Sequence, residues 1–518
     1  MRSRIRFAIG AGAAIASLVF AGAARFTRLA AAPRATSGDG LSLVAFARSE
    51  APPGDAEIDS MLESVVGDSL GERGWAALAS PNDRVVIKVN LVGPHRGAAG
   101  LKGKAIDTDP RLVKAVARAI RKEVGDGGDI VVTDALFHEG ENPSDPARAT
   151  SFFRSGYDDD GDGILDGGSR ARLVNADSYG KDRRFLTVVD EPVLGKTSVW
   201  LPDFMRPRDD PSRTGEYADV VVFLPVFKSH GFTGITGAIK LAYGLRTDGR
   251  IAGDLGRSDH SGYGWGTGNK DLLVDYLCAQ SRARKCDFVV MDCLTANRKG
   301  PLNGSEIKID AAADWIATDA LLASRDPVAI DTVECLFAGY DPDSIALLDA
   351  ASRDGLGEAR VSRILVTGAE AFGEHRARLA TRFAPKKRAG RERSTWPLED
   401  GWGGARVRTD VDPPAFTELE AVAIAGGKIA VSYGVGDSGK GATGIVRVDL
   451  LVDGALRSSI LESPAAGSFE FAPGAVSAKA SGDAPRVELV AWDGALNATR
   501  RAVALEQPVG AKKTGDAR

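Results

Sequence analysis

The chain has 518 residues, of which 26% are charged and 43% are hydrophobic, and its formal net charge is −4. These values are ordinary for a globular protein and argue against a wholly disordered, a collagen-like or a multi-span membrane chain. Four cysteines are too few for a disulfide scaffold, and an acidic surface repels phosphate backbones, so we expect no nucleic-acid partner.

The N-terminus carries an uncharged apolar run from Phe7 to Ala24, preceded by three arginines. A basic start followed by an apolar core is typical of an export signal. The run is also close to the minimum length of a membrane span, so an uncleaved anchor in the inner membrane is the alternative. We therefore predict that residues 1–35 are a signal peptide or a membrane anchor, and that the rest of the protein is periplasmic or extracellular.

Residues 36–384 alternate short apolar runs with amphipathic segments. Val85–Asn90 and Ile130–Asp134 have the β-branched composition of strands, and Asp109 followed by Pro110 is typical of a helix start between them. Strand–helix–strand units build parallel sheets. Further strands are expected at 220–226, 288–291 and 364–366, and a further helix after Asp326-Pro327. The pattern predicts an α/β domain with a doubly wound, mostly parallel sheet.

The acidic segment 157–169 has the spacing D-x-D-x-D-G-x-x-D. Alternating carboxylates can converge on one hard cation, while Gly163 permits a tight turn. The segment resembles the calcium loops of EF-hands and, more closely, of thrombospondin type 3 repeats, because Ser169 stands where an EF-hand has a bidentate glutamate. We predict a structural calcium site here; a solvated acidic loop is the alternative. The predicted ligands are Asp158, Asp160, Asp162, the carbonyl of Ile164, and Asp166.

Polar side chains cluster where the predicted strands end. Ligands of open α/β sheets gather beyond the carboxyl ends of the strands, and Asn90, Asp134, Lys228 and Asp292 all stand at such ends. The segment 228–240 adds His230, a turn rich in glycine and threonine, and Lys240. Lysine ammonium groups and exposed backbone amides suit a small anionic ligand.

These motifs together resemble the DUF362 family, a group of prokaryotic α/β proteins of no established general function. The resemblance covers residues 80–370 and is carried by Lys88-x-Asn90, Asp134, Lys228-x-His230 with the turn through Lys240, His260, Asp292 with Gly300-Pro301, and 326–331. Leu241 stands where family members often have asparagine. The cysteine-rich ferredoxin segments of many relatives are missing, so no iron–sulfur cluster is expected.

We assign candidate roles to the clustered residues as follows. The catalytic candidates are Lys228, His230, Lys240 and His260; the ligand-binding candidates are Lys88, Asn90, Asp134, Thr236, Asp292 and Asp331. The two histidines could act as acid and base or hold a divalent metal. Lys88 with Asn90 could instead be a satisfied polar pair in the core, and Asp331 could face either a site or solvent.

The cysteines lie close together in the sequence, at Cys278, Cys286, Cys293 and Cys335. An exported protein could form one or two disulfides from them. The alternative is that they are small buried residues, which is how Cys293 and Cys335 look because each stands in an apolar strand or helix.

The C-terminal part changes texture. Residues 385–414 form a linker, and 415–507 contain short strands separated by glycine turns, with Asp453-Gly454 as a strong hairpin signal. This region resembles the Ig-like β-sandwiches appended to exported bacterial enzymes, and 508–518 should be a disordered tail.

Two functions remain open from the sequence. The chain is either an exported enzyme that transforms a small anionic ligand, or a non-catalytic ligand-binding or adhesion protein of the bacterial envelope. The signature motifs of an α/β-hydrolase, a nicotinamide enzyme and a zincin are missing.

Overall fold

The computed structural model describes the chain from residue 40 to residue 504, with gaps. The described residues are 40–91, 106–135, 152, 155–176, 183–210, 215–230, 233–245, 270–298, 315–383, 408, 410–424, 428–439, 441–462, 464–472 and 486–504. The predicted N-terminal segment 1–35, His260, most of the linker and the predicted tail lie outside them. Within this part of the chain, no helix is both long and apolar enough to cross a membrane.

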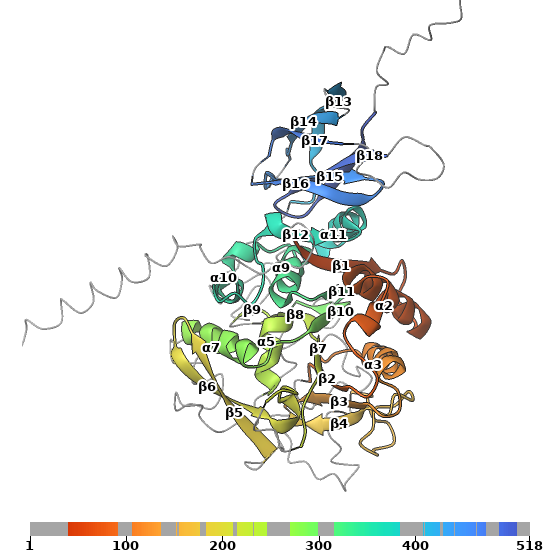
Figure 1. The fold of residues 1–518 in the computed structure, drawn as a ribbon, viewed down its shortest axis with the longest axis vertical. Helices are drawn as coiled ribbons and strands as arrows, with labels where there is room; N and C mark the ends of the chain where they lie inside the picture. The colour runs from red at the N-terminus through yellow and green to blue at the C-terminus, as the bar shows by residue number, and fades with distance from the viewer. Residues whose placement is uncertain are drawn as a thin grey trace, which may run out of the picture.

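A large mixed sheet organises the α/β domain (Figure 1). Its main path runs in the order β12-β1-β11-β10-β7-β2-β3-β4, and β8 and β9 lie off this path. The strands are β1 (Ser42–Arg48), β2 (Arg84–Val89), β3 (Asp129–Asp134), β4 (Arg172–Asn175), β7 (Val220–Leu224), β8 (Val226–His230), β9 (Gly234–Ile235), β10 (Phe288–Asn297), β11 (Trp315–Ser324) and β12 (Ile364–Val366). Neighbours from β10 through β7, β2 and β3 to β4 are parallel, whereas β11 is antiparallel to both β1 and β10. The doubly wound, mostly parallel α/β fold is confirmed.

Helices cover both faces of this sheet (Figure 1). On one face lie α2 (Asp55–Leu70) and α3 (Pro110–Val124); on the other lie α5 (Gly237–Leu241), α7 (Lys270–Ala283), α9 (Pro327–Phe337), α10 (Ala346–Arg353) and α11 (Ala369–Phe383). Side chains alternate between the two cores along each strand. In β2, Val85, Ile87 and Val89 pack toward α3, and Val86 packs toward the opposite face. Lys88 therefore extends from the same face of β2 as Val86, the face that α5 covers.

Two predicted helix starts are confirmed. Asp109 caps α3 by accepting a 2.9 Å hydrogen bond from the Arg111 amide, and Asp326 caps α9 through the amides of Val328 and Ala329. A capping carboxylate satisfies amides that have no partner within the helix.

The strand expected at 220–226 is instead divided in two at Pro225. Proline has no amide hydrogen for the ladder, so β7 ends at Leu224 and β8 begins at Val226. The second piece, β8, leaves β7 and pairs with β10, and the register between them shifts before Lys228 meets Asn297. This break carries Lys228 and His230 out over the carboxyl edge of the sheet.

A β-sandwich follows the α/β domain, as predicted. One sheet contains β13 (Ala415–Ile424), β14 (Lys428–Gly436) and β17 (Ala466–Phe471); the other contains β15 (Ile445–Val452), β16 (Ala455–Leu461), β18 (Val487–Asp493) and β19 (Ala498–Ala502). The predicted hairpin turn at Asp453-Gly454 joins β15 to β16, with φ of 52° and 80°, as a two-residue turn requires.

The sandwich is packed directly onto the α/β domain. The side chain of Arg447 in β15 is fully buried, donates a 2.6 Å hydrogen bond to the carbonyl of Ile364, and stacks 4.3 Å from the ring of Trp492. Arg408, which lies within the predicted linker, donates 2.7 Å to Asp341 and 2.6 Å to the carbonyl of Gly494. Because these guanidinium groups bond across the boundary, the two domains share one interface rather than a loose tether.

All four cysteines are free thiols. Cys278, Cys293 and Cys335 are fully buried, so the interpretation as small buried residues applies and the disulfide alternative does not.

Candidate functional site

The polar residues predicted from strand ends do come together, at the carboxyl edge of β2, β3 and β8. Lys88 at the end of β2 donates a 2.8 Å hydrogen bond to Asp134 at the end of β3. Asp134 also accepts hydrogen bonds from the amides of Leu91 and Ala135. Burial lowers the pKa of Lys88 and raises the pKa of Asp134, and in each case the charged partner opposes the shift.

Gly244 packs closely against this ion pair. A Cβ on Gly244 would lie 2.0 Å from Asp134 Oδ1 and 2.6 Å from Lys88 Nζ, so only glycine fits at this approach. The carbonyl of Gly244 accepts a 2.9 Å hydrogen bond from the Ala135 amide. Lys88 and Asp134 thus brace the 3₁₀ helix η7 (Ala242–Leu245) against the sheet, which is the role of a satisfied polar pair.

Lys228 is the second buried lysine of the edge. Its ammonium group donates to Asn90 Oδ1 and, at 2.6 Å, to the carbonyl of Ile106. Burial is the main cause that lowers its pKa to about 7; the carboxylates of Asp107 and Asp134 oppose the shift, and the cations Lys240 and Lys88 add to it. Sequence reasoning missed Asp107, which is fully buried and accepts a 2.7 Å hydrogen bond from Ser155; it follows no strand and belongs to no motif.

Asp292 joins the edge to the start of α3. Its carboxylate accepts hydrogen bonds from the amides of Asp109 at 2.7 Å and Leu294 at 3.0 Å. Burial raises the pKa of Asp292 to about 7, and the nearby Asp109 carboxylate raises it as well. The described contacts of Asp292 therefore indicate a structural role, because they link β10 to the start of α3.

The short helix α5 begins at the carboxylate of Asp331. The amides of Ala238 and Ile239 donate to Asp331 at 2.6 and 3.0 Å, and Gly237 has a φ of 54° where a Cβ would lie 2.5 Å from Asp331 Oδ2. Asp331 therefore faces the site region and not solvent. Because the amides of Ala238 and Ile239 already donate to Asp331, they are not available to the anionic ligand that the sequence predicted at this turn.

The hydroxyl of Thr236 in this region is 1% exposed and has no hydrogen-bond partner among the described residues. The carboxyl group of Glu334 is 0% exposed and lies next to the backbone amide of Lys228. Burial raises the pKa of Glu334 well above its ordinary value, and the Asp331 carboxylate adds to the shift. Sequence reasoning missed Glu334, although its position three residues after Asp331 places both on one face of α9.

The remaining catalytic candidates are placed less completely. His230 is 2% exposed at the end of β8, and Lys240 in α5 places its ammonium group 5.5 Å from the ring of Tyr243. His260 lies outside the described residues, so the predicted pairing of the two histidines has no described geometry.

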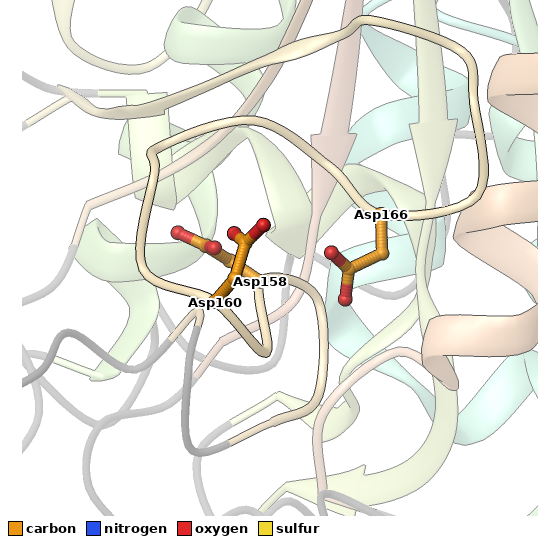
Figure 2. Close-up of side chains that lie close together, drawn as sticks. All are labelled: Asp158, Asp160 and Asp166. Carbon is orange, nitrogen blue, oxygen red and sulfur yellow. The ribbon is translucent and has the colours of Figure 1, made fainter.

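The acidic segment forms a loop that lies against α3, where Lys114 approaches Asp166 and Arg121 donates a hydrogen bond to the carbonyl of Ser169. Oxygen atoms of Asp158, Asp160 and Asp166 lie within 4.8 Å of one another, and Figure 2 shows Asp158 and Asp160 together with Asp166 facing them across the loop. Asp158 accepts hydrogen bonds from the amides of Gly161, Asp162 and Gly163, which draws the chain around it.

Two predicted calcium ligands of this loop stand outside that group. The carboxylate of Asp162 accepts a 2.7 Å hydrogen bond from the amide of Ile164, while Ile164 forms an isolated bridge with Arg172. Lys114 of α3 approaches Asp166 at 3.3 Å.

Residues 209–335 match the family model DUF362, described as a domain of unknown function. The chain contains a DUF362 domain. This domain spans β7 to the first two and a half turns of α9, and so holds Lys228, Lys240, Asp331 and Glu334. No curated protein and no solved structure matches the chain.

Proposed function

We propose that this DUF362-domain protein is exported and binds a small anionic ligand at the carboxyl edge of its main sheet. The proposed contact groups are Lys228, His230, Thr236 and Lys240. An acidic loop that binds structural calcium supports the fold beside the site.

The observation that carries the proposal is the convergence of cationic groups in a buried place. Lys240 and, from β2, Lys88 lie near enough to Lys228 to lower its pKa, while the carboxylates of Asp107 and Asp134 oppose them. Bringing like charges together costs free energy, which a bound anion returns. The unpartnered hydroxyl of Thr236, which immediately precedes α5, adds a hydrogen-bond donor at the same edge.

Four of the residues predicted to bind the ligand bind other groups of the protein instead, so fewer residues are available for ligand contact than the sequence suggested. Lys88, Asp134, Asp292 and Asp331 each bind other groups of the protein and hold the walls of the site. We therefore assign them to positioning and assign ligand contact to the β8–α5 segment.

Calorimetric titration with sulfate tests the contact set. Lys240→Gln should weaken sulfate binding by about tenfold, because it removes one of the converging charges. The control Lys122→Gln removes an exposed charge from α3, on the opposite face of the sheet, and should bind like the wild type. Equal sulfate affinities for wild type and Lys240→Gln would contradict the assignment.

The calcium part of the proposal rests on the carboxylate cluster of the acidic loop. Burial and the neighbouring Asp160 both raise the pKa of Asp158, which is what a site short of positive charge produces. Oxygen ligands from closely spaced aspartates are those that calcium prefers.

Calcium titration by calorimetry tests this part. The wild type should bind one calcium ion, and Asp160→Ala or Asp162→Ala should abolish the heat of binding. Asp159→Ala, which removes an exposed carboxylate outside the alternating pattern, is the matched control and should leave binding intact. Absence of heat in the wild type would refute the calcium site.

A further inference from the structure

A two-stranded hairpin lies against the α/β domain outside its main sheet. It consists of β5 (Arg184–Glu191) and β6 (Gly195–Pro202), which pair only with each other among the described strands. Figure 1 shows the hairpin beside α7. Phe185, Val199 and Leu201 of the hairpin belong to the same hydrophobic core as α7. This hairpin is not among the elements that the sequence pattern predicts.

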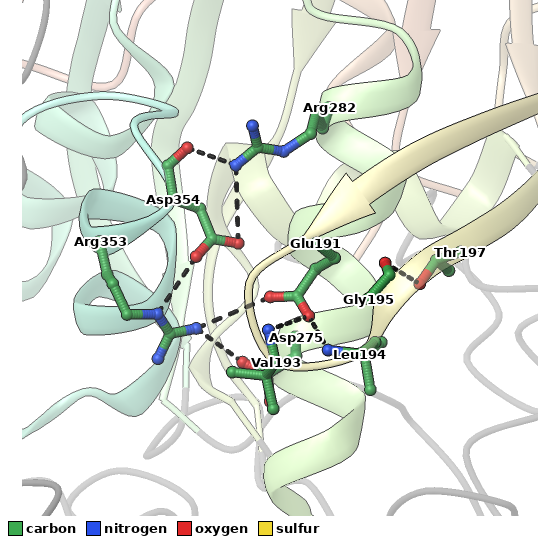
Figure 3. A network of polar contacts seen from close by, with 9 residues as sticks. All are labelled: Glu191, Val193, Leu194, Gly195, Thr197, Asp275, Arg282, Arg353 and Asp354. Carbon is green, nitrogen blue, oxygen red and sulfur yellow. Dashed lines mark hydrogen bonds and ion pairs between the residues drawn. The ribbon is translucent and has the colours of Figure 1, made fainter.

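Glu191 ends β5 and faces a cluster of charged side chains from α7 and α10 (Figure 3). One carboxylate oxygen, Oε2, accepts hydrogen bonds from the amides of Val193 and Leu194 and so closes the hairpin turn. The other, Oε1, points to Arg353 at 3.8 Å and accepts no hydrogen bond from the described residues.

Arg353 connects three carboxylates. Its guanidinium group lies 2.8 Å from Asp275 of α7 and 3.2 Å from Asp354, the residue that follows α10. Arg282 of α7 is the second cation and lies 3.9 Å from Asp354 Oδ2, which likewise accepts no hydrogen bond. The side chains of Glu191 and Asp354 are both 0% exposed.

The charges in this cluster do not balance unless a proton is present. Three carboxylates, on Glu191, Asp275 and Asp354, face two guanidinium groups, so the fully ionised cluster has one excess negative charge. A buried excess charge is costly. Glu191 and Asp354 lie within hydrogen-bonding reach of each other, and a proton on Asp354 would both join them and neutralise the cluster.

We propose that Asp354 carries a proton that it donates to Glu191, and that this hydrogen bond holds the β5–β6 hairpin on α7 and α10. Loss of the proton in alkaline solution leaves two carboxylates facing each other and loosens the hairpin. The hairpin would then expose the outer side of α7, whose inner side is joined to α5 by a 3.2 Å hydrogen bond from Ser281 to the carbonyl of Ile239.

The direction of the pH dependence follows from the Asp354 carboxyl group. Burial raises its pKa to about 7, the Arg353 and Arg282 guanidinium groups oppose the shift, and Glu191 adds to it. Because the docked state holds the proton more tightly than the released state, docking is strongest below about pH 4 and weakens until the pH has passed about 7. The other facing group is the buried thiol of Cys278 on α7, whose pKa is raised well above its ordinary value and which stays neutral; Lys196 of β6 is exposed.

Hydrogen exchange of the full-length protein, followed by mass spectrometry from pH 5.5 to pH 7.5, tests this proposal. Protection factors of the amides in 184–202 should fall about tenfold over this range in the wild type. In Glu191→Gln the amide keeps an acceptor for the turn and gives Asp354 a permanent N–H donor, so protection should stay level. Protection should also stay level in Asp354→Asn, because the asparagine amide is a permanent N–H donor to Glu191.

Asp190→Asn is the matched control, because Asp190 is the adjacent carboxylate on β5 and is exposed. It should follow the wild type. The proposal is overturned if wild-type protection is the same at both ends of the pH range, or if Glu191→Gln and Asp354→Asn lose protection as steeply as the wild type. The wild-type series decides on its own if a variant fails to fold.

Discussion

Lys88 and Asp134 form an ion pair that has almost no contact with water, with side chains 1% and 5% exposed. A buried pair of this kind gains little over an apolar pair, but a single partner left alone is strongly destabilising. The pair also carries the amides of Leu91 and Ala135, so it fixes the chain where two strands end.

The pair predicts a strongly non-additive mutant cycle. Lys88→Met should cost about 3–5 kcal/mol in the free energy of unfolding, because it leaves the Asp134 carboxylate buried without its cation. The double variant Lys88→Met, Asp134→Asn should be more stable than Lys88→Met alone, since no unpaired charge remains. Urea denaturation at pH 7 measures both; additive losses would show that the two side chains do not act as a pair.

Among the secondary-structure elements, the sequence predicted the helix starts and the hairpin turn that depend on neighbouring residues. An aspartate followed by proline predicted the starts of α3 and α9, and Asp453-Gly454 predicted the turn between β15 and β16. Each of these features is completed by residues two or three positions away, so the sequence contains all of its parts.

Elements whose geometry depends on distant partners were not predicted. The break between β7 and β8 needed both Pro225 and the pairing of β8 with β10. The β5–β6 hairpin has exposed apolar residues such as Leu186 and Val188, which weaken the alternation that marks a surface strand. The antiparallel direction of β11 depends on its pairing with both β1 and β10, which are far apart in the sequence.

The same distinction applies to the candidate site. The predicted strand ends correctly indicated that Asn90, Asp134 and Lys228 lie at one edge of the sheet, because the carboxyl ends of parallel strands lie together. Whether each group is available to a ligand depends on contacts 93 to 138 residues apart in the sequence, such as Asp331 with Ala238 and Lys228 with Asn90. No spacing rule reveals those partners.

At the scale of the whole molecule, the β-sandwich is an integral part of the fold. The fully buried Arg447 side chain bonds to β12, and Trp492 of β18 contributes to the core of the α/β domain. Arg376 of α11 adds a 2.8 Å hydrogen bond to Asn497 and a further one to the carbonyl of Asp410. The sandwich thus covers the β12–α11 end of the α/β domain and leaves the carboxyl edge of β2 and β3 on another side (Figure 1).

Lys228 is proposed to provide positive charge to an anion site, and the pH dependence of sulfate binding measures that contribution. Burial lowers the pKa of Lys228 to about 7, so the ammonium group loses its proton as the pH rises above that value. Sulfate does not titrate in this range and reports the protein alone. Calorimetry at pH 6.0 and pH 8.5 should show wild-type affinity falling roughly thirtyfold.

The variants separate Lys228 from its neighbours. Lys240→Gln should bind sulfate more weakly than the wild type but keep the pH dependence, whereas Lys228→Met should bind weakly at both pH values. Circular dichroism checks that each variant is folded. Wild-type affinity that is equal at pH 6.0 and pH 8.5, or a pH dependence that survives in folded Lys228→Met, would contradict the account.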